Sequence, residues 1–393
     1  MNKKKLLILN GSHGEISLIN AAKNLGFYVI TSGNDSAGLG HSYADENIFA
    51  DYSDFEKICN LAEAQKVDAV VSCSNDFGII TAAYVGEKLN LPGHDSFETA
   101  CKLHHKDTFR QLVEKYNLHA PRAVAFDSAE KACAVKMNFP LIVKPIDLSS
   151  GMGVTKVSNA AELIPAVDRA FNMTRAGKIV IEPFIEGTAH SFSTFLINRK
   201  VAAYFSDNEY TFKNPFLISS SAGPATAIDK VKNILIGDIE KLAQNLNLVD
   251  GIFHVQYILR ENQPYILEAT RRTSGDLYSI PVEYTLKIPW SKMTVQAEIG
   301  MPVEKLPQPQ NVQLFAGRHC IMGERNGTVK DVEISEELAE NIFDKLLWYK
   351  RGFQIENYLK DKLGILFLKF DTEAEMLSKI NRITELVKVV YED

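Results

Sequence analysis

The stretch from Gly251 to Arg272 constrains the fold most, because it reads as two consecutive strands joined by a short turn. Apolar and aromatic residues fill 252–259 and 265–270, and Glu261-Asn262-Gln263 between them is typical of a hairpin connection. Side chains alternate faces along a strand, so Gln256 and Glu268 stand opposite each other if the connection has an odd number of residues. A slip of one residue would place them on opposite faces of the sheet.

The polar residues of this hairpin indicate a cation site. An amide facing a carboxylate, with the Thr270 hydroxyl two residues further on, makes a seat for a hard cation such as Mg²⁺. Arg271 and Arg272 follow at once, and a guanidinium beside a metal suits phosphate. A surface hairpin with one satisfied polar pair is the alternative, and this stretch alone does not separate the two.

The N-terminal part alternates strands and helices. Apolar strands at 6–9, 28–31 and 69–72, with helical patterns between and after them, predict a parallel, doubly wound sheet up to about Pro92. Ligands of such sheets lie beyond the carboxyl ends of the strands. The candidate rim residues are Gly11, Ser12, Gly33, Asn34, Asp35, Ser74, Asn75 and Asp76. A nicotinamide-dependent oxidoreductase is a minor alternative, because Ser17 occupies the third glycine position of a GxGxxG motif.

Length and composition exclude several classes of protein. A chain of 393 residues exceeds one ordinary core, so two or three domains are expected. The net charge of −6 argues against a nucleic-acid partner, and no apolar run is long enough to cross a bilayer. The basic start leads into only four apolar residues, so we expect a first strand and no signal peptide. Five scattered cysteines without a CxxC pair predict reduced thiols in a cytoplasmic protein.

The centre of the chain carries features that suit a nucleotide. Lys144 ends a very apolar strand at 139–145, and an inward-facing lysine needs an anionic partner. The small residues at 149–154 let backbone N–H groups approach a phosphate, although a plain glycine turn explains them as well. Without a following Gly-Lys-Ser/Thr, this is not a Walker-type loop. The strand 178–184 leaves through 185–187, a connector whose backbone can meet an adenine edge.

Two flanking segments complete the central region. Residues 94–117 are expected to be helical in two pieces, with Lys106 near the junction. By itself, such a lysine is an ordinary solvent-facing residue. The stretch 206–224 is too long for a simple turn, so we expect a loop that serves as a substrate lid.

Taken together and in this order, these segments resemble the ATP-grasp superfamily over most of the chain. The motifs that carry the resemblance are Lys106, Lys144 with its glycine loop, Ile181-Glu182-Pro183-Phe184-Ile185-Glu186-Gly187, and Gln256, Glu268, Thr270 and Arg272. The type is that of carboxylate–amine ligases, similar to the ATP-grasp region of carbamoyl-phosphate synthetase large subunits. The resemblance implies a multidomain α/β and α+β chain, with a doubly wound N-terminal domain at 1–93. An ATP-grasp domain would follow at 94–309, with a lid at about 120–190, and a small α+β domain at 310–393.

The resemblance also implies roles for individual residues. ATP would be bound by Lys106, Lys144, Ser150, Gly151, Gly153, Glu182, Phe184, Ile185 and His190. Mg²⁺ or Mn²⁺ would be held by Gln256, Glu268 and Thr270, and the catalytic residues would be Lys144, Glu268 and Arg272. Substrate contacts would come from Arg271, Arg272, Ser274, Asp276 and Tyr210. The implied reaction activates a small-molecule carboxylate as an acyl phosphate and couples it to an amine, with an amino acid among the acceptors. A homodimer is compatible with this reading.

Two departures from the family pattern leave alternatives open. Thr270 stands where the pattern has asparagine, and the glutamate that usually holds the ribose is replaced around Ala189 and His190. A nucleotide-binding regulator without catalysis is therefore one alternative, and a carboxylase-type enzyme acting on bicarbonate is another.

The C-terminal part is expected to be α+β. Strands are predicted at 312–318 and 364–370, helices at 336–346 and 373–387, and a turn at 327–329. Arg318 and His319, at the end of the first of these strands, are candidates to reach the active site.

Overall fold

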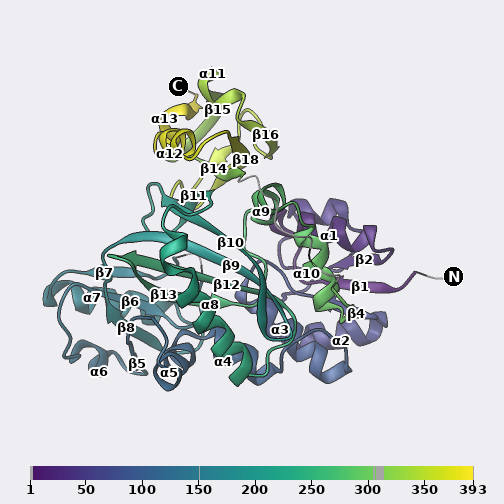
Figure 1. The fold of residues 1–393 in the computed structure, drawn as a ribbon, viewed down its shortest axis with the longest axis horizontal. Coiled ribbons are helices and arrows are strands. Elements are labelled where there is room, and N and C mark those ends of the chain that lie inside the picture. Colours follow the sequence, from purple (N-terminus) through teal and green to yellow (C-terminus); the bar gives the residue numbers. More distant parts are fainter. Residues whose placement is uncertain (1–2, 150, 304–305, 307–313, 393) are drawn as a thin grey trace.

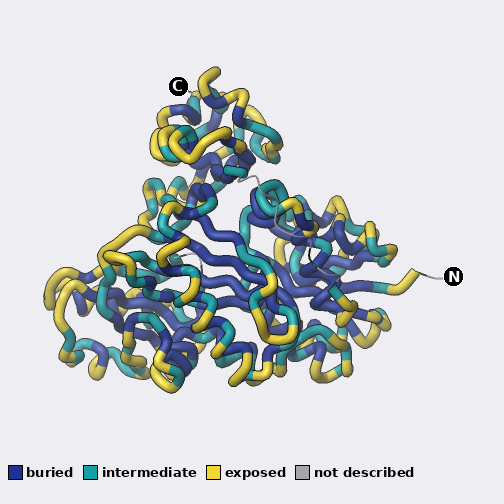
Figure 2. Tube along the Cα trace, in the orientation of Figure 1, coloured by how far each residue is buried: buried dark blue, intermediate teal, exposed yellow. Residues whose placement is uncertain are grey.

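The computed structural model describes residues 3–149, 151–303, 306 and 314–392, and it arranges them around four β-sheets. Figure 1 shows the N-terminal sheet at the right, a small sheet at the lower left, and a large sheet that runs from the centre towards the C-terminal part at the top. The central strands are buried, whereas the exposed residues concentrate on loops and outer helices (Figure 2).

The N-terminal sheet is parallel and doubly wound, as predicted. Its strands are β1 (Lys5–Ile8), β2 (Tyr28–Thr31), β3 (Glu46–Asn47) and β4 (Ala69–Val71), in the order β3-β2-β1-β4. Alternating side chains of β1 pack on α1 (Ile16–Asn24) on one face and on α2 (Phe55–Gln65) and α3 (Asp76–Leu89) on the other. Two short 3₁₀ helices, η1 (His13–Glu15) and η2 (Leu39–Tyr43), follow β1 and β2.

The predicted helical region after this sheet is confirmed, with its break at the expected place. It forms α4 (Phe97–His104) and α5 (Lys106–Tyr116). A small antiparallel sheet then follows, with β5 (Val124–Phe126), β6 (Leu141–Pro145), β7 (Thr155–Val157) and β8 (Ile179–Pro183) in the order β5-β8-β6-β7. The helices α6 (Ala129–Cys133) and α7 (Ala160–Met173) pack on it through a core of its own.

The large sheet contains eight strands in the order β13-β12-β9-β10-β11-β14-β18-β16. Its first part consists of β9 (Thr188–Ile197), β10 (Lys200–Thr211), β11 (Ile218–Gly223), β12 (Gly251–Arg260) and β13 (Gln263–Thr270). The helix α8 (Ile228–Asn245) buries one face of these strands together with α4 and α5. The chain continues through α9 (Ser279–Leu286) to α10 (Trp290–Glu298), which packs beside α1 on the N-terminal sheet.

The hairpin β12–β13 has the predicted pairing of Gln256 with Glu268, but it reaches this pairing in a different way. Arg260 pairs with Gln263, so the connection between the strands contains an even number of residues. In a regular hairpin, this would place Gln256 and Glu268 on opposite faces of the sheet. A bulge beside Gln256 supplies the extra residue, Leu267, and restores the register. Ile266 therefore faces the core under α8, whereas Glu268 faces the other side of the sheet.

The stretch 206–224, predicted as a loop, is mostly strand. Residues up to Thr211 belong to β10 and those from Ile218 to β11, and only the segment between them forms a connection. The sequence pattern was misleading because serines and asparagine, which disfavour strands on an exposed surface, are buried here between neighbouring strands.

The C-terminal part continues the large sheet through β14 (Phe315–Met322), β16 (Ile342–Leu347) and β18 (Lys362–Phe370). A three-stranded sheet, β17-β15-β19, is formed by β15 (Gly327–Ile334), β17 (Gln354–Ile355) and β19 (Val387–Tyr391). The predicted helix at 336–346 is wrong, because α11 (Glu336–Ala339) is a single turn followed by the edge strand β16. The predicted turn at 327–329 opens β15, and the helix at 373–387 divides into α12 (Glu373–Asn381) and α13 (Ile383–Leu386).

In the described part of the chain, none of the helices is both long and apolar enough to span a bilayer. None of the five cysteines, all of which lie in the described residues, is part of a disulfide.

Candidate active site

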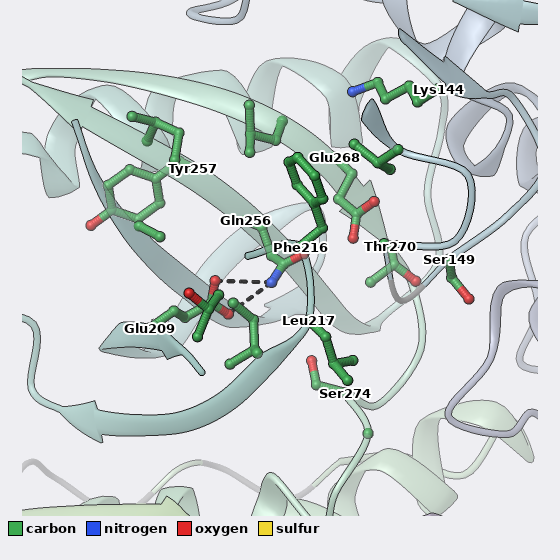
Figure 3. Close-up of a pocket in the computed structure, with 18 of the residues that line it drawn as sticks. Lys144, Ser149, Glu209, Phe216, Leu217, Gln256, Tyr257, Glu268, Thr270 and Ser274 are labelled. Atoms are coloured by element: carbon green, nitrogen blue, oxygen red, sulfur yellow. Dashed lines mark hydrogen bonds between the residues drawn. The ribbon is translucent and has the colours of Figure 1, made fainter. Parts of the chain in front are cut away.

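A cavity of about 360 Å³ lies where the small sheet, the large sheet and the rim of the N-terminal sheet meet. Figure 3 shows its wall, with Lys144 on one side, Glu209 on the other and Gln256 between them. The cavity is lined by many of the predicted site residues: Lys106, Lys144, Gly151, Glu182, Phe184, Ile185, Gln256, Glu268, Thr270, Arg272, Ser274 and Asp276.

Lys144 is held by a buried carboxylate. It lies on β6, and its Nζ donates to Oε1 of Glu182 on the neighbouring strand β8 at 2.5 Å. Burial lowers the pKa of Lys144 to about 8, although the Glu182 charge acts in the opposite direction. The predicted anionic partner of this lysine therefore exists within the chain, and it fixes the ammonium group at the cavity wall.

Arg110 organises the same carboxylate from the other side. Its Nε and Nη2 donate to Oε2 of Glu182 at 3.0 and 2.8 Å. Its guanidinium also donates to the carbonyls of Ile266 and Leu267, which form the bulge before Glu268. Burial would raise the pKa of Glu182, but the Arg110 and Lys144 charges lower it below its ordinary value. Arg110 thus ties the lysine of the small sheet to the hairpin of the large sheet.

The second predicted lysine lies at the start of α5. Lys106 is buried, and its Nζ donates to the Leu148 carbonyl at 2.6 Å, at the entrance to the glycine loop. The same Nζ lies 4.0 Å from Oε2 of Glu268. Two cationic side chains that are far apart in the sequence therefore face one cavity.

Gln256 and Glu268, the residues of the predicted cation seat, lie opposite each other on β12 and β13. Nε2 of Gln256 donates to both oxygens of Glu209, at 2.8 and 2.9 Å, which leaves its amide oxygen on the side of Glu268 (Figure 3). Oxygen donors of this kind fit Mg²⁺. Among the described residues, no group of three or more histidine, cysteine, aspartate and glutamate side chains is arranged to hold a metal. A cation here would therefore take further ligands from bound phosphates or water, as Mg²⁺ commonly does.

Glu209 was not predicted from the sequence. Burial and the neighbouring Asp207 charge raise its pKa to about 8. Asp207 accepts hydrogen bonds from the hydroxyl groups of Ser191 and Tyr278. The site consequently holds a second acidic region beside the cation seat.

Arg272 is oriented by the N-terminal sheet. Its Nε donates to Oδ1 of Asp76 at 2.8 Å, and both side chains are largely buried. Asp76 opens α3 at the predicted rim, and Nδ1 of His104 lies 3.6 Å from the same oxygen. The Arg272 charge, acting against burial, lowers the pKa of Asp76. The carboxylate stays ionised and keeps the guanidinium at the cavity.

A cationic group from the C-terminal part completes the wall. Nζ of Lys362 lies 2.6 Å and Nη1 of Arg318 lies 3.1 Å from the Asp276 carboxylate, and His13 contacts it at 3.2 Å. Asp276 and Leu277 both have left-handed backbone conformations, with φ of 58° and 52°. Asp276 therefore positions Lys362, Arg318 and the His13 ring in addition to lining the cavity, and Arg318 lines the same cavity.

The connection between β10 and β11 forms part of the cavity wall, since Pro215, Phe216 and Leu217 line it together with Gly151. A Cβ added to Gly151 would lie 2.3 Å from the Phe216 carbonyl oxygen. The glycine loop and this connection therefore pack closely enough that a side chain between them would collide.

Four residues that were predicted to contact ligands are absent from the cavity lining. The first is Gly153, which lies against Pro145 and Met173. His190 stacks on Tyr257 and shares a strand face with Phe192 of the α8 core, so it is absent from the cavity lining. Arg271 is buried away from the cavity, where it pairs with Asp95 at 2.9 Å and donates to backbone carbonyls. Tyr210 packs on the C-terminal core because the alternation of β10 turns Glu209 towards the cavity instead.

Other predictions have different outcomes. Ser150 lies outside the described residues. His319 bonds to Ser220 and is absent from the cavity lining. Arg110 was missed, although its place one turn after Lys106 on the same helix was a usable signal. Glu209 and Lys362 gave no such signal, because their roles depend on strand pairings between distant segments.

Comparisons with known proteins agree with this architecture. The family model "D-ala D-ala ligase C-terminus" matches residues 113–203. The C-terminal section of the carbamoyl phosphate synthase large chain from Methanocaldococcus jannaschii is 22% identical over 331 residues, which cover 81% of this chain and 53% of that protein. The chain thus spans about half the length of this relative.

Two solved structures align over 100% of this chain and 100% of their own. The L-amino acid ligase from Bacillus licheniformis has a TM-score of 0.82 at 20% identity. The phosphoribosylglycinamide synthetase from Anaerococcus prevotii has a TM-score of 0.79 at 22% identity. With the lysines, the glycine loop and the Gln256–Glu268 pair in one cavity, the chain has the ATP-grasp fold that these solved structures share.

Proposed function

We propose that the chain is an ATP-dependent ligase that activates a carboxylate as an acyl phosphate and couples it to an amine. The observation that carries this proposal is the convergence of Lys106, Lys144 and Arg272 on the cavity that also contains Glu268. Three buried cations in one cavity match the charge of a triphosphate better than that of a neutral ligand.

The proposed nucleotide site uses the contacts described above. Lys106 and Lys144 bind the phosphates, and Glu182 and the Leu148 carbonyl keep both ammonium groups in place. Phe184 and Ile185 offer apolar surface for the base at the connection between the small and large sheets. Gln256 and Glu268, with Thr270 at the cavity, would hold Mg²⁺, which offsets phosphate charge when bound.

The chemistry then proceeds in two transfers. An oxygen of the substrate carboxylate attacks the γ-phosphorus, and the bond to the β-phosphate oxygen breaks, which gives an acyl phosphate and ADP. The amine nitrogen attacks the acyl carbon, a C–N bond forms, and phosphate leaves while the nitrogen loses a proton. Arg272 and the two lysines stabilise the negative charge on the transferring group. Closure by the Phe216 connection excludes water, which would hydrolyse the acyl phosphate.

The proposal is tested by measuring ADP and phosphate release with Mg²⁺, ATP and a panel of carboxylates and amines, with bicarbonate included to detect a carboxylase. We expect release that depends on both an organic carboxylate and an amine. Glu268→Gln should lose it, because the neutral amide cannot offset the cation charge. Glu63→Gln, at an exposed position on α2, is the matched control. Undiminished release by Glu268→Gln would refute the assignment.

A further inference from the structure

The bulge in the hairpin β12–β13 is bound by a single side chain from α5. Leu267 is the extra residue beside the Gln256–Glu268 pair. Successive carbonyls of a regular strand point in opposite directions, but those of Ile266 and Leu267 both accept from the Arg110 guanidinium, at 3.2 and 2.7 Å. Arg110 therefore binds a backbone geometry that a regular strand does not offer.

The bulge also decides which way Glu268 faces. Regular pairing from the turn onwards would place Glu268 opposite Val255 instead of Gln256. Val255 is buried in the core under α8, so the carboxylate would leave the cavity for the apolar face of the sheet. The bulge instead keeps the Glu268 side chain at the cavity.

The bulge lies at an edge of the sheet, where Arg110 takes the place of a neighbouring strand. In the described part of the chain, β13 is the outermost strand of the large sheet. Arg110 is only 5% exposed, so its bonds to the two carbonyls are shielded from water. A buried carbonyl that loses its donor is unfavourable, and loss of the guanidinium would therefore destabilise the bulged strand.

The other end of the guanidinium holds the phosphate-binding side of the cavity. Its Nε and Nη2 donate to Oε2 of Glu182, whose Oε1 accepts from Lys144. Nη2 is shared, because it also donates to the Leu267 carbonyl. A displacement of the small sheet from the hairpin would lengthen one of these two contacts. Arg110 thus connects the position of Lys144 to that of Glu268.

We propose that Arg110 is a positioning residue for the cation. It stabilises the bulge that turns Glu268 into the cavity, and it couples this cation ligand to the phosphate-binding Lys144. Mg²⁺ demands near-ideal ligand geometry, so a small displacement of Glu268 weakens cation binding more than it weakens nucleotide binding by the lysines. This inference rests on the proposed ligase function, and it adds a residue that is itself absent from the cavity lining.

The test is equilibrium binding of a fluorescent ATP analogue to the full chain, with and without Mg²⁺. Arg110→Lys keeps the charge beside Glu182, but one ammonium group cannot reach the carboxylate and both carbonyls as the planar guanidinium does. We expect Mg²⁺ to strengthen binding to the unaltered chain, and this strengthening to fall about tenfold or more in Arg110→Lys. Affinity without Mg²⁺ should change little. Arg169→Lys, at an exposed position on α7, is the control.

A double variant shows whether Arg110 acts through Glu268. Glu268→Gln should itself lose the effect of Mg²⁺. Arg110→Lys in that background should then cause no further loss of affinity, because both substitutions remove the same contribution to cation binding. A further loss as large as that in the single variant would mean that Arg110 acts elsewhere, which would overturn the proposed role.

The outcomes separate this inference from the function on which it rests. An unchanged Mg²⁺ effect in Arg110→Lys would overturn the positioning role and leave the ligase intact. Absence of analogue binding to the unaltered chain would instead overturn the ligase and the cation site together. Should Arg110→Lys fail to fold, as judged by its melting temperature, Glu182→Gln replaces it, because this variant removes the charge that anchors the guanidinium. A reduced Mg²⁺ effect in Glu182→Gln supports the role, and an intact one refutes it.

Discussion

Glu182 is the residue on which the proposed phosphate site depends most. It is buried, and it accepts hydrogen bonds from Lys144 through one oxygen and from Arg110 through the other. Because the two cations share one carboxylate, the Lys144 ammonium group is fixed without being neutralised completely. The ammonium group of Lys144 therefore still attracts a phosphate, whereas a lysine paired with its own carboxylate would attract it less.

Replacement of Lys144 by methionine should abolish ADP formation, because the side chain keeps its length but loses the charge at the phosphates. Glu182 keeps its two bonds to Arg110, so we expect little loss of thermal stability. Measured ADP release and melting temperature check both statements. Lys136→Met, at an exposed position before the same strand, is the control. Normal turnover in Lys144→Met would show that the lysine binds no phosphate.

A second residue-scale prediction concerns pH. Glu298 on α10 accepts from the Ser72 N–H and hydroxyl at 2.6 and 2.9 Å, and burial raises its pKa to about 7. The folded chain therefore binds a proton that the unfolded chain releases near pH 4.5. The resulting stability is fully present below that pH and is lost as the pH rises through 7, by up to about 3 kcal/mol. Glu298→Gln should flatten the melting temperature between pH 5 and 8. If the melting temperature of Glu298→Gln depended on pH as steeply as that of the unmodified chain, Glu298 would not be the group that binds this proton.

At the residue scale, the sequence could predict those side chains whose position follows from local alternation. Lys144 ends an apolar strand, and Gln256 and Glu268 belong to one hairpin. Glu209 and Arg110 could not be assigned in this way, because their partners come from other segments of the chain. His190 was misassigned because the stretch around it fixes no strand face until β12 pairs with β9.

Among the elements, the glycine loop and the connection between β10 and β11 line the cavity side by side. Gly151 and Gly177 both have left-handed φ values, 71° and 67°. A Cβ at Gly151 would meet the Phe216 carbonyl, whereas a Cβ at Gly177 would find nothing within 4 Å. A comparison of alanine substitutions at Gly151 and Gly177 therefore separates the effect of backbone strain from the effect of a collision with Phe216.

We predict that Gly151→Ala lowers kcat and raises KM for ATP by about tenfold or more, because the loop can no longer pack under the connection. Gly177→Ala should show the destabilisation of a left-handed alanine, about 1 kcal/mol, with unchanged kinetics. Steady-state kinetics and thermal melting of the two variants measure both effects. Equal kinetic losses in the two variants would contradict a specific role for the Gly151 contact.

Element prediction succeeded where the pattern is local and failed where pairing is remote. The hairpin, the helices α4 and α5 and the parallel strands all carry their own periodicity. Residues 342–346 belong to the predicted helix at 336–346, but pairing with β18 at the sheet edge makes them part of the strand β16. The bulge at Leu267 could not be predicted from the sequence either. The pairing of Gln256 with Glu268 depends on this bulge.

The whole molecule is organised so that distant parts meet at one cavity. The N-terminal sheet supplies Asp76, α10 returns to cover that sheet, and β14 and β18 bring Arg318 and Lys362 from the C-terminal part (Figure 1). The N-terminal unit is therefore more than a neighbouring domain, because its rim orients the arginine proposed to act on the transferred phosphoryl group.

Asp76→Asn should lower kcat about ten- to a hundredfold with KM for ATP nearly unchanged, because the amide holds Arg272 less firmly but leaves the lysines in place. Asp76→Glu should recover part of the activity. Asp35→Asn, at an exposed position on the same rim, is the control. An effect confined to melting temperature would mean that Asp76 serves stability alone.

The most direct test of the ligase chemistry follows oxygen atoms. Once the screen has identified a carboxylate, that substrate is labelled with ¹⁸O in its carboxyl group, and the released phosphate is examined by mass spectrometry. Attack of the carboxylate on the γ-phosphorus predicts that each phosphate carries one oxygen from the substrate. Unlabelled phosphate, released while the amide still forms, would contradict the acyl phosphate and with it the role assigned to this cavity.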